Sequence, residues 1–325
     1  SRHHSNSNCR KIKQFSKVVT LDLKPRYSWA MHHSITIIGR FGAIATFSAC
    51  LISCASPTDR LLKDNELEPE IVQGVAFEHL VVHKQGSSKD SRLHVYIEGD
   101  GTPWMDGNVV AIDPTPKNPL ALRLMLRDRN SSVYVGRPCY FGVMSSGRCE
   151  SEDWTFGRYS EHVVESMASA IGRIVAVGGY QEVRLIGYSG GGVIALLAAN
   201  RVPETTSVVT VAANLDTDEW TRTREFLPLH NSLNPADVDP LLSGIVHVQL
   251  AGELDQVVPL SVTESFRRSG HRSELWLYAD FDHRCCWEDA WPEILERLDS
   301  RLGVPRVSLG ERTHARHRKC RAPAQ

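Results

Sequence analysis

Short runs of β-branched and apolar residues alternate along the chain with longer stretches in which apolar residues recur every three or four positions. The short runs are typical of buried strands, and seven of them occur, at 76–83, 93–97, 133–135, 183–186, 207–212, 245–250 and 275–278. The longer stretches predict amphipathic helices at 161–177, 259–268 and 288–302. Strands that alternate with helices in this way predict an α/β fold with a mostly parallel sheet.

The chain has enough apolar material for one large core, since its 325 residues are 42% hydrophobic and 23% charged. We place a single domain at 76–305, after a linker at 54–75. The longest irregular stretch, 214–243, follows the strand at 207–212. A loop of this length in a compact domain is usually functional, so we expect a lid or a pocket wall there, with a plain excursion as the alternative.

Positive charge is concentrated at the two ends of the chain. Residues 1–30 carry seven Lys or Arg against one acid, and residues 306–325 carry six against one, although the formal net charge is only -1. Residues 31–305 are therefore acidic. An acidic body argues against a nucleic-acid partner, because that binding depends on cations that neutralise phosphates. We expect both basic ends to be disordered.

The segment 31–53 has the composition of an export signal. It begins at Met31, the first methionine, is weakly basic up to Arg40, and then runs through 13 mostly apolar residues to Ser53, just before Cys54. This pattern resembles a bacterial lipoprotein signal, which implies that Cys54 carries a lipid and holds the domain on a membrane of the cell envelope, facing the periplasm. The apolar run is too short to span a bilayer, which takes about 20 residues. The alternatives are a cleaved secretory signal and a cytoplasmic protein without export.

Five cysteines follow Cys54, so at least one thiol is unpaired or pairs elsewhere. Cys139 and Cys149 flank the turn-forming residues Ser145-Ser146-Gly147, which favours a local disulfide in an oxidising periplasm. Such a bridge would stabilise the fold by at most about 3 kcal/mol. No Cys or His pair has the spacing of a zinc site, so we expect no metal.

A glycine-rich pentapeptide links two of the predicted elements. Gly187-Tyr188-Ser189-Gly190-Gly191 follows the strand at 183–186 and precedes an apolar, helix-like run at 193–199. Glycines on both sides allow a serine to occupy a strained strand-to-helix turn, where a flanking β-carbon would clash. The pattern predicts a nucleophile elbow with Ser189 as the nucleophile. An ordinary glycine-rich turn is the alternative.

Ser189 needs a base, because a serine hydroxyl is a poor nucleophile until its proton is removed. His283 is the candidate, since it lies in the loop that follows the last strand, at 275–278. A carboxylate must then fix the imidazole tautomer and stabilise the imidazolium. Asp255, in the loop after the strand at 245–250, is the first choice.

Three other aspartates compete for this third role. Asp216 follows the strand at 207–212 and would otherwise cap a helix in the irregular stretch, whereas Asp280 and Asp282 closely precede His283. Like Asp255, each of them comes after a strand, where the loops of a parallel sheet form functional sites.

The order Ser189, Asp255, His283, together with the elbow and the stretch from Gly252 to Pro259, resembles the α/β-hydrolase superfamily. The resemblance covers about residues 76–302. It implies an α/β-hydrolase fold, in which helices flank a mostly parallel, eight-stranded sheet and the excursion follows the sixth strand. It also implies an enzyme in which Ser189 is the nucleophile, His283 the base and Asp255 the orienting acid. We expect no cofactor.

An acyl-transfer site also needs N–H donors for the oxyanion. The N–H of Gly190, just after the nucleophile, is one by geometry. Where the superfamily often has His-Gly-x-Gly, this chain has Glu98-Gly99-Asp100-Gly101, so the resemblance implies the N–H of Asp100 as the second donor. The loop departs from the family here, because two carboxylates beside a forming anion would repel it unless they turn away.

Three side chains near these motifs are candidates for the substrate pocket: Trp104, Arg137 and Tyr188. Trp104 and Tyr188 would form aromatic walls. Arg137 would bind a carboxylate or phosphate of the substrate, or would instead pair with Glu98 or Asp100.

These residues predict a serine hydrolase that cleaves an ester, thioester or related acyl substrate through an acyl-enzyme. Two alternatives use the same scaffold. One is a non-catalytic binding module, and the other is an acyltransferase that uses the same serine.

Overall fold

The computed structural model describes residues 56–86, 91–143 and 148–302. The predicted basic ends, the export segment 31–53 and Cys54 lie outside these residues. No helix within the described ranges has both the length and the apolar content needed to cross a bilayer.

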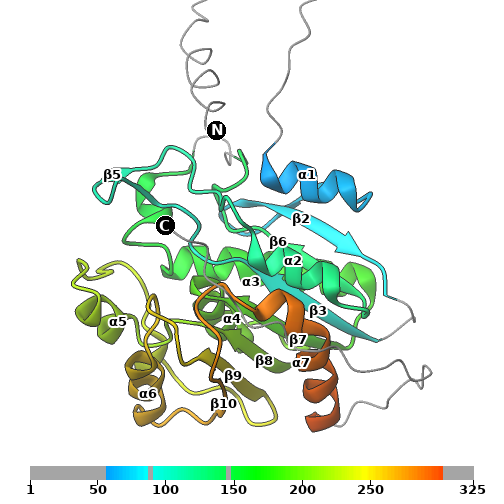
Figure 1. Ribbon diagram of the computed structural model, residues 1–325. Coiled ribbons are helices and arrows are strands. Elements are labelled where there is room, and N and C mark those ends of the chain that lie inside the picture. Colours follow the sequence, from blue (N-terminus) through cyan, green and yellow to red (C-terminus); the bar gives the residue numbers. More distant parts are fainter. Residues whose placement is uncertain (1–55, 87–90, 144–147, 303–325) are drawn as a thin grey trace, which may run out of the picture. The chain divides into compact units, whose positions relative to one another are not determined.

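Eight strands form one large sheet (Figure 1). Their order across the sheet is β1-β2-β6-β3-β7-β8-β9-β10. β2 is antiparallel to both of its neighbours, and all strands from β6 to β10 in this order run parallel. The strands are β1 (Pro69–Gln73), β2 (Glu78–Lys84), β3 (Arg92–Ile97), β6 (Ser132–Val135), β7 (Glu182–Tyr188), β8 (Thr205–Val211), β9 (Val246–Gly252) and β10 (Glu274–Tyr278).

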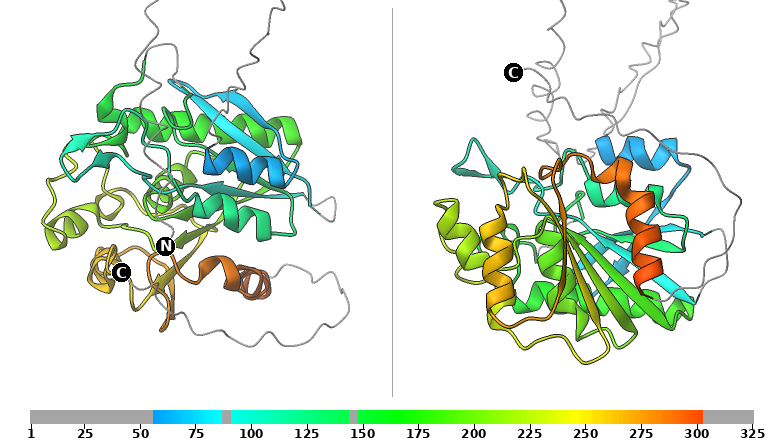
Figure 2. Two further views of the ribbon diagram at one scale, coloured as in Figure 1. Left: turned by 45° about the horizontal axis from the view of Figure 1, so that its top comes forward. Right: turned by 60° about the horizontal axis from the view of Figure 1, so that its bottom comes forward.

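Helices cover both faces of this sheet (Figure 2). One face packs against α1 (Pro57–Asp64), α2 (Leu120–Arg127) and α7 (Trp287–Arg301), and the other against α3 (Glu161–Gly178), α4 (Gly190–Ala199) and α6 (Leu260–Arg268). Side chains alternate between the two cores along each strand. In β7, for example, Leu185 lies in the core with α3 and α4, whereas Ile186 lies in the core with α2 and α7.

The seven predicted strands and three predicted helices are present, with ends displaced by a few residues. The prediction of a linker at 54–75 was wrong for most of its length, because residues 57–64 form α1 and residues 69–73 form β1. β1 was not predicted, because it is an edge strand with four exposed residues out of five and shows no alternation of buried and exposed residues. β1 completes the sheet of eight strands that the α/β-hydrolase resemblance implied.

The irregular stretch 214–243 follows β8, the sixth strand of the large sheet in chain order. It contains α5 (Thr217–Thr223) and a short 3₁₀ helix, η2 (Pro235–Asp237). Leu233 donates a backbone hydrogen bond of 3.0 Å to the carbonyl of Tyr159, and Nε1 of Trp220 donates one of 2.9 Å to the carbonyl of Val257. Hydrogen bonds to two separate loops argue against a hinged lid and agree with either a pocket wall or a plain excursion.

Candidate active site

Ser189 lies at the junction between β7 and α4, as the elbow requires. Its φ of 52° is in the left-handed region, which non-glycine residues rarely occupy. A Cβ on Gly187 would come within 2.2 Å of the carbonyl oxygen of Gly191, and one on Gly191 within 2.2 Å of that of Ile97. Both glycines are therefore needed for the tight packing of the turn, so the glycine-rich pattern has a steric cause.

Three side chains from separate loops form a hydrogen-bonded chain. Nε2 of His283 is 3.2 Å from Oγ of Ser189, and Nδ1 of His283 is 2.8 Å from Oδ2 of Asp255. The His283 side chain is 12% exposed and that of Asp255 2%. The partly exposed imidazole can take up a proton from the serine on one side while the buried carboxylate orients it on the other.

The Asp255 carboxylate is fixed by its own loop. Its Oδ1 accepts hydrogen bonds of 2.8 Å from the N–H groups of Val257 and Val258, which leaves Oδ2 for His283. This turn lies directly after β9, so the rigid sheet sets the position of the acid.

The three competing aspartates have other partners or lie exposed. Asp216 caps α5 through the N–H of Glu219, and its Oδ2 accepts a hydrogen bond of 2.6 Å from Oγ of Ser265. Asp282 accepts the N–H groups of the two residues that follow His283 and is exposed, as is Asp280. Of the four candidates, only Asp255 is hydrogen-bonded to His283 within the described part of the chain.

The loop after β3 lies beside the serine. A Cβ on Gly99 would be 3.2 Å from Cβ of Ser189, and one on Gly190 would be 2.1 Å from Oδ1 of Asp100. Neither the N–H of Gly190 nor that of Asp100 has an acceptor among the residues that the structure describes. Two N–H groups next to the nucleophile can therefore serve as the donors of an oxyanion hole.

The Asp100 carboxylate is turned into the interior and neutralised there. Nη1 of Arg137 donates to its Oδ1 at 2.9 Å, while Nη1 of Arg158 and the hydroxyl of Tyr159 donate to its Oδ2 at 3.0 and 2.7 Å. Burial acts to raise the pKa of Asp100, but the charges of Arg158 and Arg137 outweigh it and hold this pKa below its usual value.

The Glu98 carboxylate is also turned away from the serine. It accepts hydrogen bonds from the N–H groups of Gly99 and of Ala121, which lies in the first turn of α2. Glu98 is only 1% exposed. Burial raises the pKa of Glu98 to about 7, although these N–H groups lower it. Both acids of the departing loop thus have internal partners instead of facing a developing anion.

We expect the titration of Glu98 to make stability depend on pH. The unfolded carboxyl has a pKa of 4.5, whereas the folded one has a pKa of about 7. The folded protein holds this proton more tightly, so the free energy of unfolding should fall by about 3 kcal/mol between pH 4.5 and pH 8 through this group. Glu98→Gln cannot titrate and should therefore gain about 3 kcal/mol relative to the wild type over that interval.

Urea unfolding of the wild type and of Glu98→Gln at pH 4.5 and pH 8 measures this difference. Glu264→Gln, at an exposed position of α6, is the control. A Glu98→Gln variant whose stability relative to the wild type is the same at both pH values would refute the expectation.

Arg137 does not line a pocket, contrary to one of the two roles predicted for it. The residue is 1% exposed, and its guanidinium pairs with Asp100 and stacks near the rings of Tyr140 and Tyr159. A substrate carboxylate or phosphate cannot reach a side chain that is enclosed in this way. The other predicted role, pairing with an acid of the 98–101 loop, is the one that the structure shows.

The two aromatic pocket candidates differ in their surroundings. Trp104 lies in the hairpin of β4 (Trp104–Met105) and β5 (Val109–Val110) and is half-buried. Its ring packs edge-on against that of Phe156, with the ring centroids 5.6 Å apart. Tyr188 is 8% exposed, and its ring lies 5.2 Å from that of His283. Tyr188 therefore supports the imidazole, whereas Trp104 retains an exposed surface on the loop after β3.

Sequence reasoning missed Arg158 and Tyr159, which contact Asp100 from the loop before α3. No motif surrounds them. The only signal in the sequence was a charged residue in the largely uncharged segment Trp154–Ser160, and that did not indicate a partner.

Two disulfides occur among the described residues. Cys139 and Cys149 are joined, as the flanked turn predicted, with Cα atoms 5.7 Å apart. The adjacent Cys285 and Cys286 also form a disulfide, two residues after His283 and directly before α7. The first bridge ties down the segment that follows Arg137, and the second lies in the loop that carries the imidazole.

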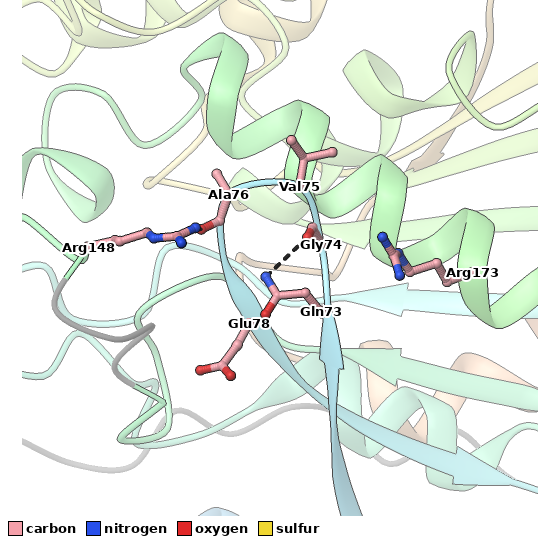
Figure 3. Close-up of a pocket in the computed structure, with 7 residues that line it drawn as sticks. All are labelled: Gln73, Gly74, Val75, Ala76, Glu78, Arg148 and Arg173. Carbon is pink, nitrogen blue, oxygen red and sulfur yellow. Dashed lines mark hydrogen bonds between the residues drawn. The ribbon is translucent and has the colours of Figure 1, made fainter.

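A surface hollow of about 490 Å³ lies elsewhere, at the turn between β1 and β2. Figure 3 shows Arg148 and Arg173 on either side of this turn and the hydrogen bond of 3.1 Å from the Gln73 amide to the carbonyl of Gly74. None of the predicted site residues lines it. Within the described ranges, no cluster of His, Cys, Asp or Glu side chains could hold a metal ion.

Solved structures resemble this chain in fold. An esterase from Pyrococcus furiosus superposes with a TM-score of 0.53 at 12% sequence identity, over 74% of this chain and 93% of that one. A puromycin hydrolase superposes with a TM-score of 0.51 at 17% identity, over 75% of this chain but only 40% of that one. No protein-family model and no curated protein matches the sequence. The order of the sheet, the helices on both faces and these likenesses show that the chain has the α/β-hydrolase fold.

Proposed function

We propose that this protein is a serine hydrolase that cleaves an ester, thioester or related acyl substrate. The observation that carries the proposal is the hydrogen-bonded chain from Ser189 through His283 to Asp255, with the serine held on a strained elbow. Fold alone would not support it, because one fold hosts many functions. A fold shared with an esterase agrees with the proposal.

The geometry supports a two-step mechanism. Nε2 of His283 accepts the hydroxyl proton as Oγ of Ser189 attacks the acyl carbon, and the N–H groups of Gly190 and Asp100 donate to the resulting oxyanion. The imidazolium then gives its proton to the leaving group, which departs as an alcohol or thiol. A water molecule, deprotonated by His283, attacks the acyl-enzyme in the second step and releases the acid and the free serine.

A fluorophosphonate probe tests the nucleophile directly. We expect the folded wild type to gain one covalent label at Ser189, detected by mass spectrometry of the digested protein, and Ser189→Ala to gain none. Equal labelling of Ser189→Ala would contradict the assignment. A folded wild type that stays unlabelled while it binds a ligand would instead indicate a binding module. Product analysis with a competing alcohol separates hydrolysis from acyl transfer.

A further inference from the structure

Two buried guanidinium groups share a single carboxylate beside the elbow. Arg137 and Arg158 are 1% and 5% exposed, and each pairs with a different oxygen of Asp100. Their other acceptors are neutral, because Nη2 of Arg137 donates to the carbonyl of Arg158, and Nε of Arg158 to that of Thr155. Asp100, Arg137 and Arg158 form a charged cluster with one positive charge in excess. It lies in the protein interior, where an unpaired charge is costly.

Two further acids on adjoining segments do not complete this cluster. The Glu98 carboxylate is directed to the start of α2, and Asp113 is exposed and accepts the N–H of Thr115. In the part of the chain that the structure describes, neither of them forms an ion pair with Arg137 or Arg158. Among the described residues, the excess charge thus has no acid partner at ion-pair distance.

The charged cluster packs against Gly190, the first residue of α4. A Cβ on Gly190 would be 2.1 Å from Oδ1 of Asp100 and 2.5 Å from the hydroxyl of Tyr159, so these groups contact the main chain that follows the nucleophile. On the other side, the hydroxyl of Tyr140 donates a hydrogen bond of 2.9 Å to the carbonyl of Asp100. Of the two residues whose N–H groups are proposed to bind the oxyanion, Asp100 therefore belongs to the charged cluster and Gly190 contacts it.

We propose that Arg137 and Arg158 are positioning residues of the oxyanion hole and act through Asp100; this inference rests on the proposed function. Their ion pairs keep the N–H of Asp100 beside Ser189, and their excess positive charge stabilises the anion that forms when the serine attacks. The scissile group of an ester substrate carries no charge before the serine attacks. The two arginines therefore act on the transition state and contribute little to substrate binding.

Arg158→Gln tests the proposal, because it removes the excess charge while Arg137 still pairs with Asp100. With the active sites counted by fluorophosphonate titration, we expect kcat per site to fall about 10- to 100-fold and KM to change less than about threefold. The inhibition constant of a trifluoromethyl ketone, which forms an oxyanion with the serine, should rise by the same factor as kcat falls. Arg158→Lys, which keeps the charge, should restore most of the loss.

Arg184→Gln is the matched control, because Arg184 is also buried and pairs with one acid, Asp299, but lies in β7 away from the elbow. It should lower stability and leave kcat per titrated site unchanged. If Arg158→Gln does not fold, Tyr159→Phe replaces it, since it removes one of the two hydrogen bonds to Oδ2 of Asp100 without a change of charge and should lower kcat several-fold at constant KM.

The outcomes separate the two proposals. A reactive wild type with an unchanged kcat per site and inhibition constant in Arg158→Gln, or in Tyr159→Phe where that variant is used, overturns the inference alone. A folded wild type that never reacts with the fluorophosphonate overturns the proposed function and this inference together.

Discussion

His283→Ala is expected to lower kcat by about 10⁶-fold on any ester that the wild type hydrolyses, with KM largely unchanged. The imidazole is the group within hydrogen-bonding distance of Oγ of Ser189 that can take its proton, so its loss leaves a neutral hydroxyl as the nucleophile. Steady-state kinetics with a chromogenic ester measures the loss. The double variant Ser189→Ala/His283→Ala should be no slower than either single one, because the two residues act as a unit.

His83→Ala is the control for the loss of an imidazole. His83 lies on β2, is exposed, and contacts Glu70 on β1. Its removal should change kcat less than about twofold. More than about one hundredth of the wild-type kcat in folded His283→Ala would argue that another base serves Ser189.

Asp255→Asn is expected to lower kcat by about 10⁴-fold. Asparagine would keep the shape of the side chain, but its amide would favour the wrong imidazole tautomer and would not stabilise the imidazolium. The N–H groups of Val257 and Val258 would still find an acceptor in the amide oxygen, so the fold should persist. Kinetics with the same ester, beside a thermal melt, separates the loss of catalysis from a loss of structure.

Asp216→Asn distinguishes the two acids that follow adjacent strands. Because the Asp216 carboxylate caps α5 and accepts a hydrogen bond from Ser265 instead of contacting His283, its replacement should leave kcat within about threefold of the wild type. The effect on stability should be small, because asparagine caps a helix as well as aspartate does. A large loss of kcat in Asp216→Asn, with Asp255→Asn nearly as active as the wild type, would reverse the assignment of the acid.

The parts of the site that could be predicted from the sequence are those that depend on local geometry. The elbow is such a part, because any residue larger than glycine at position 187 or 191 would clash with main-chain atoms. His283 and Asp255 followed from their places after two strands, because the ends of parallel strands meet at one edge of a sheet. Local sequence and strand order together were enough to place three side chains within hydrogen-bonding distance.

The surroundings of Asp100 could be predicted only in part, because they depend on contacts between segments far apart in sequence. Arg137 and Arg158 are 37 and 58 residues away from Asp100, and neither lies in a recognisable motif. Pairing with Glu98 or Asp100 was one of the two roles predicted for Arg137, whereas nothing in the sequence indicated a partner for Arg158. β1 and α1 were missed for the opposite reason, since their mostly exposed residues carry little pattern.

The contact between Asp100 and Gly190 also constrains how this sequence can diverge. A neutral residue at position 100 would leave two buried cations without a carboxylate, and a β-carbon at position 190 would displace the acid from both of them. Substitutions at 100, 137, 158 and 190 are therefore coupled by epistasis. Related chains that have lost the acid at 100 should have lost at least one of the two arginines as well.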